Sequence, residues 1–214
     1  MTKEIKRLLV FVLGILGTAL GNALIFNANL GNTAWGVVAV NINRYNSNIS
    51  EGFALGILSC VVFILCRFVE KEFNLIKDIV GLMMSLIFGS LISLFSNLTQ
   101  FLVFDTFLLQ FFVLILGIVI LAFSIVVYLK ADIFKLPFDD SVVVFAKNLF
   151  KNNIAYGSYF CVFLAFIITM VFVTLTGNLY GFNFITVIIC IIFGPILDIF
   201  FKKSKWIDVI IGNS

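Results

Sequence analysis

Long apolar runs alternate with short polar breaks along the whole chain. Several of these runs approach or exceed the roughly 20 residues that a helix needs to cross a hydrocarbon layer about 30 Å thick. The pattern therefore predicts an all-α polytopic membrane bundle, with residues 1–214 forming a single integral membrane domain. We place six transmembrane helices at residues 8–26, 53–66 with frayed ends, 76–95, 107–129, 154–175 and 182–201.

Two polar breaks stand out, one in each half of the chain. Residues 27–35 follow the first apolar run, and residues 130–140 follow the fourth. Each break leads into a helix-like stretch that is too short to cross a bilayer, as residues 33–45 illustrate. A long span, a polar break and a short amphipathic helix therefore occur once in each half.

The two halves also align with each other, which predicts an internal duplication. Repeat A covers residues 8–97 approximately and repeat B about 105–203, each with three spans. An odd number of spans makes the second copy enter the membrane from the opposite side, so the repeats would be inverted. Inverted repeats with interrupted helices are typical of secondary transporters, in which the breaks mark the binding site. The matched positions are 13–14 with 116–117 and 28–30 with 131–133, at an offset of 103, then Gly52 with Gly157 and Gly89 with Gly194, at 105.

The breaks allow two interpretations. In the first, they fold into the bundle and line a solute path, because non-helical backbone at membrane depth must be buried in protein or line a wet cavity; Gly31 would permit a left-handed turn there. In the second, both short helices lie flat in the membrane interface, with asparagines and aspartates as caps and turns. The candidate solute-binding residues are Asn27, Asn29, Gly31, Asn32, Thr33, Trp35, Asp132, Asp139, Asp140 and Asp198.

The acidic candidates have simpler explanations too. Asp139 and Asp140 are adjacent, so on a helix they point about 100° apart and do not easily share one site. Asp198 lies in the last span, where an acid is costly and usually functional. It is also one turn from Lys202, and an ion pair near the membrane surface would explain it equally.

Charge sets the expected orientation. Only 12 % of the residues are charged and 62 % are hydrophobic, against roughly 25 % and 45–50 % in soluble domains. Of the 14 lysines and arginines, all but Arg44 fall in segments on one side of the six spans. The positive-inside rule then predicts cytoplasmic N- and C-termini. Four tyrosines at predicted span ends are interpreted as interfacial anchors: Tyr128, Tyr156, Tyr159 and Tyr180.

The residue types argue against several chemistries. Histidine is absent, and the four cysteines lie in apolar runs without metal-ligand spacing. We therefore expect no enzymatic activity, no cofactor, no metal and no nucleic-acid partner. The main hypothesis is a secondary-transporter or permease-like protein for a small solute in the lipid bilayer. The alternative is a non-transporting accessory or substrate-capturing subunit, docking to a partner membrane protein or a second copy through the GxxxG faces at Gly17 and Gly52.

Both breaks resemble a known family. Residues 30–37 resemble the segment after the first span in the bacterial YczE/YyaS/YitT family of integral membrane proteins, with Ala34 in place of a proline and Gly36 in place of an acid. Residues 136–140 resemble that family's Gly-Pro-Arg-Asp-Gly turn, with Asp139 at the acid, and residues 183–195 resemble its Gly-Thr and Gly-Pro pattern in the last span. The resemblance implies a bacterial plasma-membrane protein with several spans and supplies no substrate.

Overall fold

The computed structural model describes residues 2–70, 75–102 and 106–211. Lys71 and Asp105, the first residue of the predicted repeat B, lie outside these ranges. No strand occurs within them, and the helices are α1 (Lys3–Ala28), α2 (Ala34–Tyr45), α3 (Glu51–Glu70), α4 (Leu75–Leu98), the 3-10 turn η1 (Gln100–Leu102), α5 (Phe107–Ala131), α6 (Pro137–Leu149), α7 (Ile154–Thr176), α8 (Phe184–Lys203) and α9 (Lys205–Ile211).

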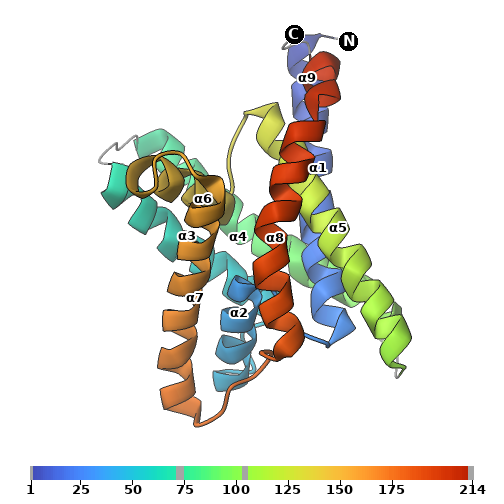
Figure 1. The fold of residues 1–214 in the computed structure, drawn as a ribbon, viewed down its shortest axis with the longest axis vertical. Coiled ribbons are helices and arrows are strands. Elements are labelled where there is room, and N and C mark those ends of the chain that lie inside the picture. The colour runs from blue at the N-terminus through green and yellow to red at the C-terminus, as the bar shows by residue number, and fades with distance from the viewer. Residues whose placement is uncertain (1, 71–74, 103–105, 212–214) are drawn as a thin grey trace.

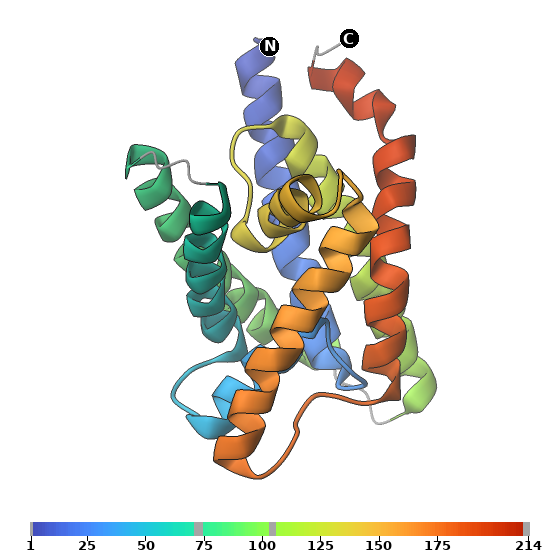
Figure 2. The ribbon, with the colours of Figure 1, turned by 60° about the vertical axis from the view of Figure 1, so that its left-hand side comes forward.

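Six of these helices are long and apolar enough to cross a membrane: α1, α3, α4, α5, α7 and α8. The predicted helical membrane bundle is therefore confirmed. α1 begins and α8 ends at the same end of the bundle, and α1, α5 and α8 follow its long axis, whereas α3 and α4 run obliquely to it (Figure 1). Seen from another side, α1 and α5 cross in the middle of the molecule (Figure 2).

Glycines bring α1 and α5 together. A Cβ on Gly14 would lie 2.5 Å from the Cβ of Tyr128, and one on Gly21 would lie 2.7 Å from the backbone nitrogen of Leu121. Side chains on α1 at these positions would clash, so their absence lets the two backbones approach closely. The largest cluster of buried side chains surrounds this crossing, including Ile15, Leu24, Leu114, Leu121 and Val126.

A second glycine contact joins α3 to α4. A Cβ on Gly52 would lie 2.5 Å from the carbonyl oxygen of Gly89. The positions that the repeat alignment matches to this pair are Gly157 and Gly194. Gly157 packs instead against the Val142 carbonyl oxygen of α6, and the Cβ position of Gly194 has only Ser158 atoms within 4 Å, the nearer at 3.6 Å. The matched pairs are therefore packed differently.

The chain turns sharply after α1 and after α5. Asn29 ends α1 with φ of 52°, and Asp132 ends α5 with φ of 49°, so both helices stop at a left-handed residue. Gly31, where we expect a glycine-specific turn, also has a positive φ, of 150°, which residues with a side chain rarely adopt. Asparagine and aspartate tolerate the left-handed region better than other non-glycine residues, because their short side chains bond locally.

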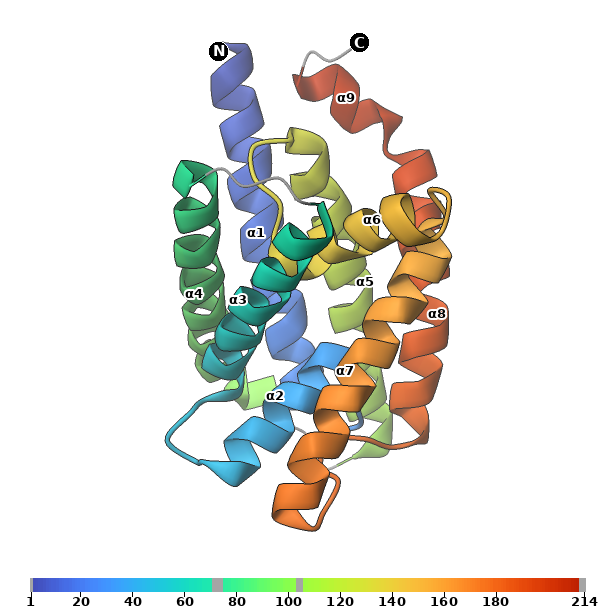
Figure 3. The same cartoon turned by 90° about the vertical axis from the view of Figure 1, so that its left-hand side faces the viewer.

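Both short helices then start inside the bundle (Figure 3). Thr33 caps α2 by accepting a hydrogen bond from the Gly36 amide at 3.2 Å, and Pro137 opens α6, where its missing N–H leaves no bond unmade. α2 and α6 each pack against both α3 and α7. Their interior positions are buried, as Val38 and Val144 show. Both short helices are therefore packed into the bundle.

Candidate functional site

The two polar breaks meet at their short helices. Trp35 lies in the first turn of α2 and Phe138 in the first turn of α6. Their rings stack, with centroids 4.9 Å apart and planes 27° from parallel. Residues about a hundred positions apart, one from each half of the chain, are thus in direct contact.

Two cavities adjoin this contact, a third shares wall residues with them, and Asp139 lines all three. The first, of about 80 Å³, has Thr33, Trp35 and Phe138 in its wall, with Thr18 and Asn22 of α1. The second, also about 80 Å³, contains both rings and reaches α7 and α8. The third, of about 280 Å³, is otherwise apolar except for Asp198, and is lined by Ile125, Leu129, Val142, Val143, Ile154, Leu197 and Phe201.

Asp139 accepts a hydrogen bond from the Tyr128 hydroxyl. Burial raises the pKa of Asp139 from 3.8 to about 7, and the Tyr128 hydrogen bond opposes that rise. No lysine or arginine among the described residues lies within ion-pair distance of it. The prediction that Tyr128 is an interfacial anchor is wrong: its side chain is 0 % exposed, because Gly14 lets α1 pack over it.

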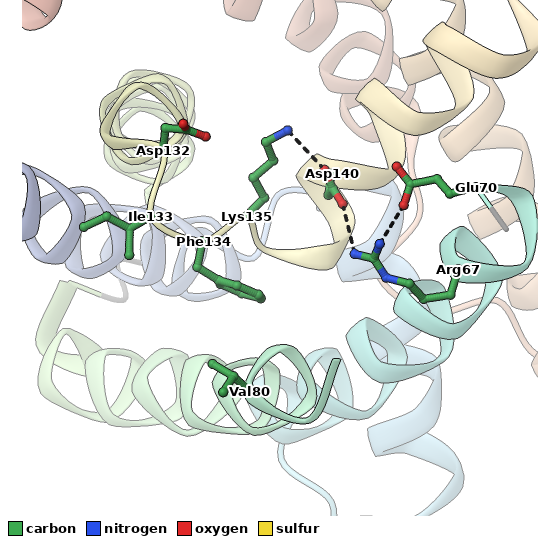
Figure 4. A pocket seen from close by; sticks show the side chains of 8 residues that line it. All are labelled: Arg67, Glu70, Val80, Asp132, Ile133, Phe134, Lys135 and Asp140. Atoms are coloured by element: carbon green, nitrogen blue, oxygen red, sulfur yellow. Dashed lines mark hydrogen bonds and ion pairs between the residues drawn. The ribbon is translucent and has the colours of Figure 1, made fainter. Parts of the chain in front are cut away.

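Asp140 faces a different environment. Its carboxylate lies 3.5 Å from Lys135 Nζ and 3.8 Å from Arg67 Nη2, and Arg67 also pairs with Glu70 at 2.7 Å. Lys135 and Arg67 reach Asp140 from opposite sides (Figure 4). These groups line a polar cavity of about 470 Å³ with Asp132. As the helical spacing predicts, the adjacent aspartates point to separate places, and only Asp139 faces the three cavities beside the stacked rings.

The first break is held by asparagines. Asn27 donates to the Ser96 carbonyl oxygen at 2.9 Å, which ties the end of α1 to α4. The backbone N–H of Asn32 donates to the Thr186 hydroxyl at 3.2 Å, and Asn183 donates to the Leu30 carbonyl oxygen. Asn29 is exposed, and Asn27, Gly31 and Asn32 are absent from the cavity walls described above. Of the six candidates in this break, Thr33 and Trp35 line the cavities.

The second break is held by Arg7 of α1. Its guanidinium donates to the carbonyl oxygens of Ala131 at 3.0 Å and Asp132 at 2.7 Å, which satisfies the end of α5. The Asp132 residue is exposed. Asp198 pairs with Lys202 at 2.5 Å, as the ion-pair explanation predicts, and its side chain is half exposed at the edge of the 280 Å³ cavity. Of the acidic candidates, Asp139 alone lines all three cavities beside the stacked rings.

Comparison with protein families gives one finding. A family model described as "Family of unknown function (DUF6198)" matches residues 5–202. The chain belongs to the DUF6198 family. The match includes both breaks and nearly all of the six apolar helices. Comparison with curated proteins and with solved structures gives no match. The YczE/YyaS/YitT resemblance therefore stays a prediction.

In this DUF6198 member, sequence reasoning missed several residues of the site. Tyr128 and Asn22 lie within apolar runs, where each was an isolated polar group with no spacing to mark it. One signal was available. A polar side chain at membrane depth is costly unless it has a partner, so the presence of Tyr128 and Asn22 in apolar runs indicates a polar partner for each. Among the described residues no three cysteines, aspartates or glutamates lie close enough to hold a metal ion.

Proposed function

We propose that this DUF6198 member is a secondary-transporter or permease-like protein that carries a small solute across a bacterial plasma membrane, with cytoplasmic termini and no enzymatic activity. The observation that carries the proposal is the stack of Trp35 on Phe138 beside the cavities. Breaks that come from opposite repeats and meet at one site are the arrangement in which transporters bind their solutes.

The packing of the helices supports an inverted duplication. α1 packs against α5, its counterpart in the other half. α2 packs on α7 just as α6 packs on α3, and each short helix also packs on the long helix that follows it. Exchanging residues 8–97 with 105–203 therefore leaves this set of contacts unchanged. α1 and α5 also run in opposite directions, as the repeats require (Figure 1).

The matched glycines support a moving part. The Gly52–Gly89 contact closes α3 onto α4, whereas the equivalent helices α7 and α8 are not joined by Gly157 and Gly194. The 280 Å³ cavity lies on this second side, with α7 and α8 contributing Ile154 and Leu197. In any one state of an alternating-access transporter, the two repeats are packed differently.

The accessory-subunit hypothesis loses its main argument. Its docking faces were the glycine pairs in α1 and α3. Gly17 faces Ser124 of α5, and Gly52 faces Gly89 of α4, so both faces are occupied within the chain. No other observation favours a docking role over transport.

Thiol labelling from each side of the membrane tests the proposal. After the four native cysteines are replaced, single cysteines are introduced as Thr33→Cys and Val142→Cys, which line the cavities from the N-cap of α2 and from α6. The variants are labelled with a membrane-impermeant maleimide in right-side-out and in inside-out vesicles. We expect each cavity cysteine to react in both kinds of vesicle, because the site opens alternately to the two sides.

The matched controls are Asn178→Cys and Asp132→Cys, at exposed positions in the turn after α7 and the turn after α5. Each should react from one side only, and from opposite sides. A transporter is ruled out if the cavity cysteines react from one side only, as in a closed-ended pocket, or from neither.

A further inference from the structure

The two adjacent aspartates differ in how their charge is balanced. Asp140 has Lys135 and Arg67 within 4 Å, whereas Asp139 has only the neutral Tyr128 hydroxyl as a donor among the described side chains. A buried carboxylate without a cation is unfavourable, so such a group either holds a proton or receives a positive charge from a ligand. The described side chains therefore supply no countercharge for an ionised Asp139.

The described helices around Asp139 place no cation within ion-pair distance of its carboxylate. α5 contributes Tyr128, and α8 contributes Asp198 and Cys190, which line the same cavities. α7 contributes Cys161, whose sulfur lies 3.2 Å from the Ser141 hydroxyl. Facing these cavities, α1 and α2 present Thr18, Asn22, Thr33 and Trp35, none of which carries a charge. α3 contributes Arg67, which lies 3.8 Å from Asp140 and pairs with Glu70, and Lys202 of α8 pairs with Asp198. The ionisable groups that line the three cavities are acids and thiols, and none of these cations pairs with Asp139. The position of Asp139 therefore favours a positive ligand.

The rest of the site suits an apolar body. The cavity of about 280 Å³ is close to the roughly 300 Å³ at which small-molecule sites begin. Its wall is aliphatic and aromatic apart from the two carboxylates. Trp35 and Phe138 line the adjoining cavities, and aromatic rings attract a cation through their faces. A ligand with an apolar body and one positive charge matches all of these features.

We propose that Asp139 binds a small amphipathic organic cation, such as a substituted ammonium ion, in exchange for a proton. This inference rests on the proposed transport function and names its solute class. Binding separates the carboxyl O–H bond: the carboxylate keeps the electron pair and pairs with the cation, and the proton leaves to water. The pKa of Asp139, which burial raises to about 7, makes both forms accessible near neutral pH.

The experiment uses the purified full-length protein carrying Trp206→Phe, which leaves Trp35 as the sole tryptophan of the two in the chain. The probe is benzyltrimethylammonium, and neopentylbenzene is its neutral isostere. Trp35 fluorescence reports binding, and a pH indicator in weak buffer reports proton release. We expect saturable binding of the cation with proton release that approaches one proton per bound cation as the pH falls below about 7, and Asp139→Asn should abolish the release and weaken cation binding by about tenfold or more.

Asp208→Asn is the matched control, because it removes the same charge from α9, where Asp208 pairs with Lys130 and lines none of these cavities, and it should leave cation affinity unchanged. The neutral isostere should bind Asp139→Asn as well as it binds the wild type, which also shows that this variant is folded. Independently of any variant, cation affinity of the wild type should fall as the pH is lowered, because protons compete for one carboxylate.

Three results would overturn the proposal: no saturable cation binding to the wild type, equal cation affinity in Asp139→Asn, or equal binding of the neutral isostere and the cation. These results are distinct from the labelling result. Labelling of Thr33→Cys and Val142→Cys from both sides with no cation site would leave a transporter of another solute. A cation site with one-sided labelling would leave a binding protein.

Discussion

Replacing Gly21 by alanine tests whether close backbone contact holds the two halves of the molecule together. A Cβ at this position would lie 2.7 and 2.8 Å from the backbone atoms of Leu121, and ordinary van der Waals contact begins at 3.4 Å. Because the obstacle is backbone rather than a flexible side chain, α1 and α5 would have to move apart by about 0.7 Å. The crossing at the centre of the bundle would then loosen.

The expected cost follows from that displacement. A gap of about 0.5–1 Å forfeits a quarter to a half of the dispersion energy between facing atoms, and overpacking a core costs about 1–3 kcal/mol. Alanine also gains about 1 kcal/mol over glycine through its better helix propensity. Gly194→Ala supplies the control for that gain, since its added Cβ would have Ser158 Oγ at 3.6 Å as its nearest neighbour.

We therefore expect Gly21→Ala to be about 2 kcal/mol less stable than Gly194→Ala, with a midpoint of thermal unfolding lower by roughly 4–8 °C. Circular dichroism of the two purified variants in the same detergent measures the difference. Equal stability of the two variants, or a more stable Gly21→Ala, would refute the conclusion that α1 and α5 are held by backbone contact.

Two further predictions concern buried polar groups. Asn41 is fully buried; it donates a hydrogen bond to the Tyr180 carbonyl oxygen at 2.8 Å and accepts one from the Tyr180 amide at 3.2 Å. Asn41→Leu should therefore lower the free energy of unfolding in detergent by about 2 kcal/mol. The exposed Asn178→Leu is the control, and a similar loss in both variants would contradict the prediction. Tyr128→Phe removes the hydrogen bond that lowers the Asp139 pKa, so that pKa should rise further above about 7. The pKa is measured from the pH dependence of the infrared band of the protonated Asp139 carboxyl group, which is identified by its absence from Asp139→Asn. An unchanged or lower pKa would contradict this prediction. Because the folded-state pKa of this acid is raised, its contribution to the free energy of unfolding is greatest below pH 3.8 and is lost as the pH rises through about 7, and Asp139→Asn should lack that decline.

The helices and the breaks were predictable because they depend on local composition. The runs before Asn27 and Lys130 are apolar over the length of a bilayer, and nothing but a helix satisfies the backbone there. Helix ends moved by a few residues: α3 runs to Glu70, beyond the predicted end at Cys66, because a helix continues through polar residues once it leaves the hydrocarbon.

The site was predictable only in part, because it depends on which helices meet. Asp139 and Trp35 could be named from the breaks, but their separation in sequence gave no sign that Trp35 would stack on Phe138. Tyr128 sits at a span end, where interfacial tyrosines are common, and only the absence of a side chain at Gly14 of a distant helix makes its position a buried one. The roles of Trp35 and Tyr128 therefore depend on contacts between helices that are distant in sequence, which the local sequence pattern does not indicate.

The bonds that complete the first break also set an order of events during synthesis. Leu30 and Asn32 are bonded by Asn183 and Thr186, which are made about 150 residues later. Until those residues arrive, the Asn32 amide, which is buried in the finished protein, has no partner, and an unpaired buried peptide group costs about 1–3 kcal/mol. The N-terminal half should therefore remain incompletely assembled at the insertion machinery until the last long helix, α8, has been inserted.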